Sequence, residues 1–296
     1  MPAGKWFAPS ASFSPGIPRC LVSDFNAPGN AKFNLQEALE TILRGDWLTD
    51  SRWQGEGVRV AILDTGISPE VLQKKHGANG TTLEPMECVV LREQEIVPSQ
   101  GKASSPHGTV VADILLSHAP RARLFSADLF GSRAGSDLDL LLRGLRLAMD
   151  TWQCKVINIS LGLSENKVLQ PWRRLQLLQV LEEAYQRDIL VFCPAHNDHP
   201  TIRSYPALFA PPLFSVNKGF LDDLLKFRYR PWQGVEFAGH GQASLAPEGT
   251  DPATSWATAQ VAGMATRLVS AWPGIKPFEM KTLLYWISES LGKREK

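Results

Sequence analysis

From Gly57 onward, short apolar runs alternate along the chain with segments of helical periodicity. The runs are typical of buried strands, and the segments between them repeat apolar residues every three or four positions. Strands that alternate with helices form a parallel sheet that is covered on both faces. The pattern therefore predicts an α/β protein with three layers, α/β/α, around a mostly parallel central sheet. The expected strands are 58–63, 124–129, 156–161 and 189–193.

Residues that begin or stop helices mark several helix ends. Ser136 with Asp139 indicates a capping box for a helix that continues to Met149. Pro273 ends a helix that follows Ser255. Further helices are expected after His107, at 175–185 and after Pro277.

The first part of the chain has a different composition from the rest. Residues 1–33 are rich in Pro, Gly and Ser and have no clear periodicity, which is typical of a surface arm. Asn34 can cap a short helix that runs through Leu43. We divide the chain into an N-terminal arm with this short helix, residues 1–55, and one domain, residues 56–296. A chain of 296 residues is long enough to bury a substantial core.

Composition excludes several classes of partner. The formal net charge is +1 and no basic stripe is present, so nucleic acid is not expected as a partner. The longest apolar runs contain prolines and are too short to span a bilayer, so no membrane association is expected. The N-terminus lacks the apolar core of a secretory signal, which predicts a cytoplasmic protein. In that compartment free thiols are expected rather than disulfides. The cysteines are Cys20, Cys88, Cys154 and Cys193.

Three residues with complementary chemistry are predicted to meet at one edge of the sheet. Asp64 ends the strand VAILD, and His107 (in SPHGTVVA) and Ser255 (in ATSWATAQVAG) begin helices. The carboxyl ends of parallel strands and the helix N-termini lie together at this edge. A serine hydroxyl needs a base to become a nucleophile, and a histidine base needs a carboxylate to orient it. Taken singly, the three residues fit a turn, a helix cap and close packing; together they indicate nucleophilic catalysis.

The chain resembles the subtilisin-like serine proteases, the subtilases, from about residue 55 to residue 291. The resemblance is carried by VAILDTG, HGTVVA, VINISLG, PAHN, SYPALFAPPLFSV and TSWATAQVAG, in this order. The order Asp, His, Ser is also that of subtilisin. The resemblance implies a subtilisin-like fold and a serine endopeptidase, in which Asp64 orients His107, and His107 deprotonates Ser255. Ser255 then attacks a peptide carbonyl and forms an acyl-enzyme.

Further site residues follow from the same resemblance. Asn197 is expected to supply the side-chain donor of the oxyanion hole, and the backbone N–H of Ser255 the second donor. The segment Ser160-Leu161-Gly162 is expected to pair with the substrate backbone as an added strand, with Gly135 on the opposing edge. Asp198, beside Asn197, is expected near the first specificity pocket, where it would favour a basic or small polar residue before the scissile bond.

The sequence departs from the family pattern at four positions near the site. Ala253 and His196 replace glycines, Ala259 replaces a proline, and Gln260 replaces a histidine. The first two are tolerated if the local backbone avoids positive φ.

No metal or other cofactor is expected. The insertion that binds calcium tightly in secreted relatives is absent after the HGTVVA segment. The pair His196 and His199 lacks a convincing third ligand.

Control of the activity and two alternative functions remain open. The arm is smaller and less regular than the prodomain of secreted subtilases. We expect residues 1–33 either to lie in the cleft as a removable inhibitor or to dock a partner. A regulatory protein partner or restricted specificity for a polypeptide substrate would control a cytoplasmic protease. The alternatives are a catalytically weakened subtilase-fold binding module and a peptide transpeptidase or macrocyclase.

Overall fold

The computed structural model describes residues 40, 44, 47, 50–78, 80–93, 95–131, 137–221, 223, 225–231 and 233–293. Contacts divide the chain into two units, Met1–Leu35 and Gln36–Lys296, and the description below concerns the second. The arm and nearly all of the helix expected up to Leu43 lie outside the described residues, and the division at residue 56 stays a prediction. Trp47, N-terminal to that division, is buried in the second unit.

Nine strands form the central sheet of this unit. They are β1 (Arg59–Asp64), β2 (Glu87–Leu91), β3 (Ile96–Pro98), β4 (Arg123–Asp128), β5 (Val156–Ile159), β6 (Leu190–Pro194), β7 (Phe214–Gly219), β8 (Arg228–Tyr229) and β9 (Phe237–His240). Their order across the sheet is β3-β2-β4-β1-β5-β6-β7-β9-β8. Neighbouring strands are parallel except for the pairs β2–β3 and β8–β9 at the two edges.

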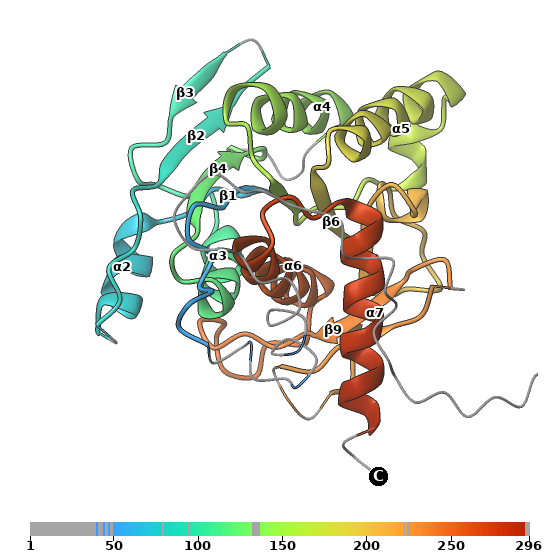
Figure 1. The fold of residues 1–296 in the computed structure, drawn as a ribbon. Coiled ribbons are helices and arrows are strands. Elements are labelled where there is room, and N and C mark those ends of the chain that lie inside the picture. Colours follow the sequence, from blue (N-terminus) through green and yellow to red (C-terminus); the bar gives the residue numbers. More distant parts are fainter. Residues whose placement is uncertain are drawn as a thin grey trace, which may run out of the picture. The chain divides into compact units, whose positions relative to one another are not determined.

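Helices cover both faces of the sheet, as Figure 1 shows. The α-helices are α2 (Pro69–Ala78), α3 (His107–His118), α4 (Leu138–Arg146), α5 (Pro171–Gln186), α6 (Thr254–Ala271) and α7 (Pro277–Lys293). Helices α4 and α5 pack together on one face, and α3 and α6 pack together on the other. Short segments of other helix types are η3 (Leu147–Thr151), η4 (Glu165–Val168) and η5 (Ala207–Phe209). The predicted three-layer α/β/α fold with a mostly parallel sheet is confirmed.

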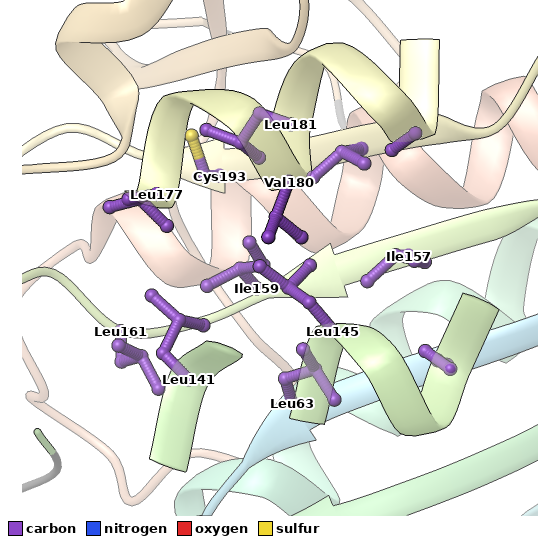
Figure 2. Close-up of a cluster of buried hydrophobic side chains, with 14 of the residues drawn as sticks. Leu63, Leu141, Leu145, Ile157, Ile159, Leu161, Leu177, Val180, Leu181 and Cys193 are labelled. Carbon is purple, nitrogen blue, oxygen red and sulfur yellow. The ribbon is translucent and has the colours of Figure 1, made fainter. Parts of the chain in front are cut away.

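A buried apolar cluster joins α4 and α5 to the sheet. Figure 2 shows side chains of both helices converging on β1, β5 and β6. The labelled residues of the helices, the strands and the segment after β5 are Leu63, Leu141, Leu145, Ile157, Ile159, Leu161, Leu177, Val180, Leu181 and Cys193. All of these side chains are almost fully buried. Burial of a leucine-sized side chain stabilises a fold by roughly 1.5–3 kcal/mol, so this cluster stabilises the packing of α4 and α5 on the sheet. None of the described helices is long and apolar enough to cross a membrane.

The four expected strands are present, and the helices expected around them begin and end close to the predicted positions. One local prediction is wrong. Helix α4 is capped by Asp137, whose side chain accepts a hydrogen bond of 2.9 Å from the backbone N–H of Leu140. The capping box of Ser136 and Asp139 is therefore not the cap, because the neighbouring carboxylate already fills that role; Ser136 itself lies outside the described residues.

Candidate active site

Asp64 and His107 form a hydrogen-bonded pair at the carboxyl edge of the sheet. Asp64, the last residue of β1, is fully buried, and its two carboxylate oxygens lie 2.8 and 3.0 Å from Nδ1 of His107. A carboxylate can only accept hydrogen bonds, so Nδ1 of the imidazole carries a proton. The neutral ring therefore presents the lone pair of Nε2, which is the atom that a base needs.

The charge of Asp64 tunes the basicity of His107. Burial alone lowers the pKa of His107, but the hydrogen bond and the negative charge of Asp64 outweigh burial, so this pKa lies above its usual value. The imidazolium that forms on proton uptake is thus stabilised. An imidazole in this setting accepts a proton more readily than one in water.

Two glycines let the turn after Asp64 touch the helix of His107. Gly66 has a φ of +80°, in the region that favours glycine. A Cβ atom on Gly108 would lie 2.1 Å from the carbonyl oxygen of Gly66, so a side chain cannot be placed there. The hydroxyl of Thr65 accepts a hydrogen bond of 3.0 Å from the N–H of Gly108 and locks this contact. The motifs DTG and HG are therefore one interlocked unit.

Ser255 lies at the same end of the molecule as His107. Gly263 of α6 approaches Leu115 of α3 so closely that an added Cβ would be 2.9 Å from the Leu115 carbonyl oxygen. Gly263 follows Ser255 by eight residues, and Leu115 follows His107 by eight residues. Farther along both helices, Arg267 donates a hydrogen bond of 2.9 Å to the carbonyl oxygen of His118. The two packed helices therefore run in the same direction, and their N-termini place Ser255 and His107 at the same end.

The nucleophile candidate is buried and not engaged by other groups. Ser255 is 9% exposed, and its hydroxyl makes no hydrogen bond to any described residue. Nε2 of His107 is thus not yet within hydrogen-bond geometry, and such bonds often close only when substrate binds. Ala253 before the helix has φ −121° and ψ 144°, an extended conformation open to any residue. His196 also avoids positive φ, so neither glycine replacement strains the site.

Asn197 is held beside Ser255 by the residue that precedes the serine. Its Oδ1 accepts hydrogen bonds from the backbone N–H of Thr254, at 2.9 Å, and from the Thr254 hydroxyl, at 3.1 Å. Because the N–H can only donate, the oxygen of the Asn197 amide must face Thr254. The NH₂ group is then free to donate elsewhere. Ser255 contributes a first-turn N–H of α6, which has no acceptor within the helix.

The segment after β5 has an open backbone edge. The side chain of Leu161 is buried in the core, and Gly162 is exposed. Among the described residues, the backbone N–H and C=O groups of these two residues have no hydrogen-bond partner. Ser160 is held at the start of this segment by the Asn158 amide, which donates to its hydroxyl at 2.7 Å. The role of Ser160, Leu161 and Gly162 in binding substrate stays a prediction, and Gly135 lies outside the described residues.

The residues around Asn197 face outward. Asp198 is largely exposed, and its backbone N–H donates to Nδ1 of His196 at 3.0 Å. The Asp198 carboxylate lies 3.5 Å from the same Nδ1, so it forms an ion pair with His196 only when the ring is protonated. Within the part of the chain that the structure describes, no group of three His, Cys, Asp or Glu side chains could hold a metal ion. The role of Asp198 in specificity stays a prediction, and so does a mechanism that needs no metal.

Some residues that shape the site were not identified from the sequence. Thr65 and Thr254 tie the turn and the amide in place, as described above. Asp128, paired in register with Asp64, accepts N–H hydrogen bonds of 2.9 Å from Phe130 and Gly131. The only sequence feature that could have identified Thr254 and Thr65 is that they lie next to the serine and the aspartate. Nothing in the sequence indicated Asp128.

Comparison with known proteins agrees with this geometry. A family model described as the subtilase family, Peptidase S8, matches residues 55–217, more than half of the chain. The alkaline protease of Alkalihalobacillus alcalophilus is 27% identical over 252 residues, which cover 80% of this chain and 60% of that protein. Subtilisin Savinase of Lederbergia lenta is 27% identical over 252 residues, covering 80% of this chain and 86% of the relative.

Solved structures share the fold. Sphericase has a TM-score of 0.61 at 20% identity, with 84% of this chain and 88% of that chain covered. A lanthipeptide protease has a TM-score of 0.60 at 18% identity, with 83% and 86% covered. The matched family segment carries Asp64, His107 and Asn197 in the arrangement described above, and the chain therefore belongs to the subtilase family of serine peptidases.

Proposed function

We propose that the chain is a serine endopeptidase that cleaves polypeptides through an acyl-enzyme on Ser255. The observation that carries this proposal is the hydrogen-bonded pair of Asp64 and His107 at the end shared by α3 and α6. It supplies an oriented base with a free Nε2 next to the helix N-terminus that bears the serine.

The reaction begins with proton transfer. His107 Nε2 takes the proton of the Ser255 hydroxyl while Oγ bonds to the carbonyl carbon of the substrate. The tetrahedral intermediate collapses, the carbon–nitrogen bond breaks, and His107 returns the proton to the leaving nitrogen. Water, deprotonated by His107 in the same way, then hydrolyses the ester and restores Ser255. Asp64 stabilises the imidazolium at each step.

The developing oxyanion binds between two donors. The free NH₂ of Asn197 and the backbone N–H of Ser255 are both fixed before substrate arrives, because Thr254 holds the Asn197 oxygen and α6 holds the serine. Donors that need no reorganisation stabilise the transition state more than the ground state. The helix dipole of α6 adds partial positive charge at the same point.

The acyl part of the substrate pairs with the open edge at Leu161 and Gly162 as an added strand. A Cβ atom added to Gly162 would be 2.0 Å from the Ser204 hydroxyl oxygen, which shows that Gly162 lies directly against Ser204. This contact narrows the space behind the edge and supports restricted specificity. Asp198 then favours a basic or small polar residue before the scissile bond. A peptide-library profile with only large apolar residues at that position would refute this role of Asp198.

We place the enzyme in the cytoplasm, under the control of a protein partner or of its own narrow specificity. The free thiols of Cys88, Cys154 and Cys193 fit a reducing compartment. Fractionation with a compartment marker, and affinity capture with the Ser255→Ala variant, test location and partner separately.

Mass spectrometry of cleavage products tests the proposed activity. A denatured protein mixture is incubated with the wild type, with Ser255→Ala and with Ser51→Ala, a matched serine replacement at an exposed position. We expect the same new peptide ends with the wild type and Ser51→Ala, and none with Ser255→Ala. Identical products from a folded Ser255→Ala protein would refute the proposal.

A further inference from the structure

The mechanism above leaves one buried charge close to the active site unused. Asp113 is fully buried and lies on α3, six residues after His107. The residues on either side of it, Ala112 and Ile114, are apolar. A buried carboxylate is costly unless it is paired and hydrogen-bonded, so its partners indicate what it does in the fold.

Two basic residues at the end of α2 hold the carboxylate of Asp113. Nζ of Lys75 donates a hydrogen bond of 2.6 Å to Oδ2, and Nε2 of His76 lies 3.0 Å from Oδ1. Both oxygens therefore have a partner in the last turn of α2, which lies beside α3 in Figure 1. Burial alone would raise the pKa of Asp113, but the hydrogen bonds and charges of these two residues outweigh burial and lower this pKa. The carboxylate is thus charged at neutral pH.

Lys75 extends this contact to the segment that precedes Ser255. The same Nζ donates a second hydrogen bond, of 2.6 Å, to the hydroxyl of Ser244. This hydroxyl in turn donates a longer hydrogen bond, of 3.4 Å, to Oδ2 of Asp113. Ser244 belongs to the segment 241–253, between β9 and α6. We call this group of side chains the charge clamp; its members are Lys75, His76, Asp113 and Ser244.

A cavity separates α3 from the segment 241–253 beside the clamp. It has a volume of about 390 Å³, and residues of the second half of α3 and residues 242–244 are among those that line it. Side chains therefore do not fill the space between the two elements there. Among the described residues, the hydrogen bond from Ser244 to Asp113 is the one that joins this segment directly to α3. The clamp thus spans a part of the interface that is not closely packed.

The three elements that the clamp joins each carry or lead to one residue of the active site. Helix α2 begins five residues after Asp64, α3 begins with His107, and the segment 241–253 ends two residues before Ser255. Asp64 and His107 are already joined by their own hydrogen bonds, whereas the Ser255 hydroxyl makes none to any described residue. The distance left open is therefore the one between Nε2 of His107 and Oγ of Ser255.

We propose that Asp113 and Lys75 are positioning residues, which hold the base and the nucleophile at the distance that proton transfer needs. A shift of the segment 241–253 reaches the start of α6, because the N–H of Ala253 donates a 2.9 Å hydrogen bond to the carbonyl oxygen of Gly241. Neither positioning side chain takes part in making or breaking bonds. This inference rests on the proposed function.

Steady-state kinetics on single replacements test this role. Asp113→Asn and Lys75→Met keep the approximate size of each side chain but remove its charge, whereas Lys75→Arg keeps the charge. The values of kcat and KM are measured on a peptide that the wild type cleaves, beside the rate of fluorophosphonate labelling and the free energy of unfolding in urea. We expect Asp113→Asn and Lys75→Met to lower kcat and the labelling rate by about 10- to 100-fold, because a misplacement of about 1 Å costs roughly 10²-fold in rate.

The split between the two constants separates positioning from substrate binding. The open edge at Leu161 and Gly162 is not part of the clamp, so KM should change by less than about twofold while kcat falls. Lys75→Arg should keep most of the wild-type kcat, because the guanidinium group can donate to both Asp113 and Ser244. Ser244→Ala removes an exposed hydroxyl and keeps the buried pair, so it should lower kcat with little change in the free energy of unfolding.

A second buried ion pair supplies the matched control. Nζ of Lys281, on α7, lies 2.7 Å from the carboxylate of Glu236, and both side chains are buried. Lys281→Met should lower the free energy of unfolding at least as much as Lys75→Met, because it also takes the partner from a buried carboxylate. It should nevertheless keep the wild-type kcat, since this pair joins other elements of the fold.

Each outcome decides one question. Folded Asp113→Asn and Lys75→Met proteins with the wild-type kcat overturn the inference, and so does a Lys281→Met protein that loses as much kcat as they do. If Asp113→Asn does not fold, Lys75→Met and Ser244→Ala decide in the same way. A folded wild type that neither cleaves peptides nor takes up the label refutes the proposed function, and the inference falls with it.

Discussion

Replacing Gly108 by alanine tests whether close backbone contact sets the catalytic geometry. The new Cβ would lie 2.1 Å from the Gly66 carbonyl oxygen and 3.3 Å from the Cβ of Asp64. Gly66 lies in the turn after Asp64, and this turn is tied to the segment of His107 because the Thr65 hydroxyl accepts a hydrogen bond from the N–H of Gly108 and donates one to the carbonyl oxygen of Ser105. The helix that carries His107 must therefore shift.

The size of the shift follows from the distances. Real Cβ contacts are essentially never shorter than 3.0 Å, so the two segments must separate by at least 0.9 Å, the difference from 2.1 Å. The same displacement would lengthen the 2.8 Å bond between Asp64 and His107 to about 3.7 Å, beyond hydrogen-bond range. A misplacement of about 1 Å costs roughly 10²-fold in rate, and overpacking costs about 1–3 kcal/mol of stability.

The assay is kcat/KM on a peptide that the wild type cleaves, with urea unfolding measured in parallel. Two alanine replacements serve as controls. Gly77→Ala meets nothing closer than 3.9 Å, and Gly144→Ala meets only leucine side chains, the nearest at 3.1 Å. Both should keep the wild-type kcat/KM, and Gly77→Ala should gain up to about 1 kcal/mol in helix stability. A Gly108→Ala protein with wild-type kcat/KM would show that the contact does not position His107.

Three further predictions concern charge and hydrogen bonding. Because the pKa of His107 lies above its usual value and the neutral ring is the active form, kcat/KM should rise with pH through a midpoint above about 6.5. Asp64→Asn should move this midpoint to lower pH and reduce kcat by about 10⁴-fold; an unmoved pH profile would contradict the pairing. Asn197→Ala should lower kcat by about 10²–10³-fold, the figure known from subtilisin itself, with little change in KM, and equal loss in both constants would argue against an oxyanion role. Burial and the charge of Arg267 lower the pKa of His118 to about 4, below its value in the unfolded chain. Urea-derived stability should therefore be full above pH 6.5 and fall between pH 6.5 and 4, by at most roughly 1.4 kcal/mol per pH unit. His118→Gln should flatten that part of the curve, and a His118→Gln protein with an unchanged slope would contradict this assignment.

The parts of the fold that were predicted correctly are those with dense apolar patterns. Strands β1, β4, β5 and β6 lie in the middle of the sheet, where helices cover both faces, so their sequences are continuous apolar runs. The edge strands β2 and β3 are short and only partly buried, so their brief apolar runs do not stand out as strands in the sequence. Helix α2 buries only Leu72 and His76, which is too sparse a pattern to reveal a helix.

Residues of the candidate site could be predicted where their place at the end of a strand or helix was enough to identify them. Contacts that depend on the distance between residues far apart in the sequence could not be predicted. Asp64, His107 and Ser255 stand at strand or helix ends, and topology brings such ends together. The hold of Thr254 on the Asn197 amide depends on contact between residues 57 positions apart in the chain, which no local pattern reports. The absence of backbone strain at Ala253 likewise depends on a backbone angle that only the structure gives.

Covalent labelling of Ser255 tests the central claim most directly. The folded wild type is treated with a fluorophosphonate, digested, and mapped by mass spectrometry, beside folded Ser255→Ala and His107→Ala proteins. We predict one adduct, on the peptide that contains Ser255, absent from Ser255→Ala and formed far more slowly in His107→Ala. A folded wild type that takes up no label, or that takes it up at another residue, would contradict the assignment of Ser255 as the nucleophile.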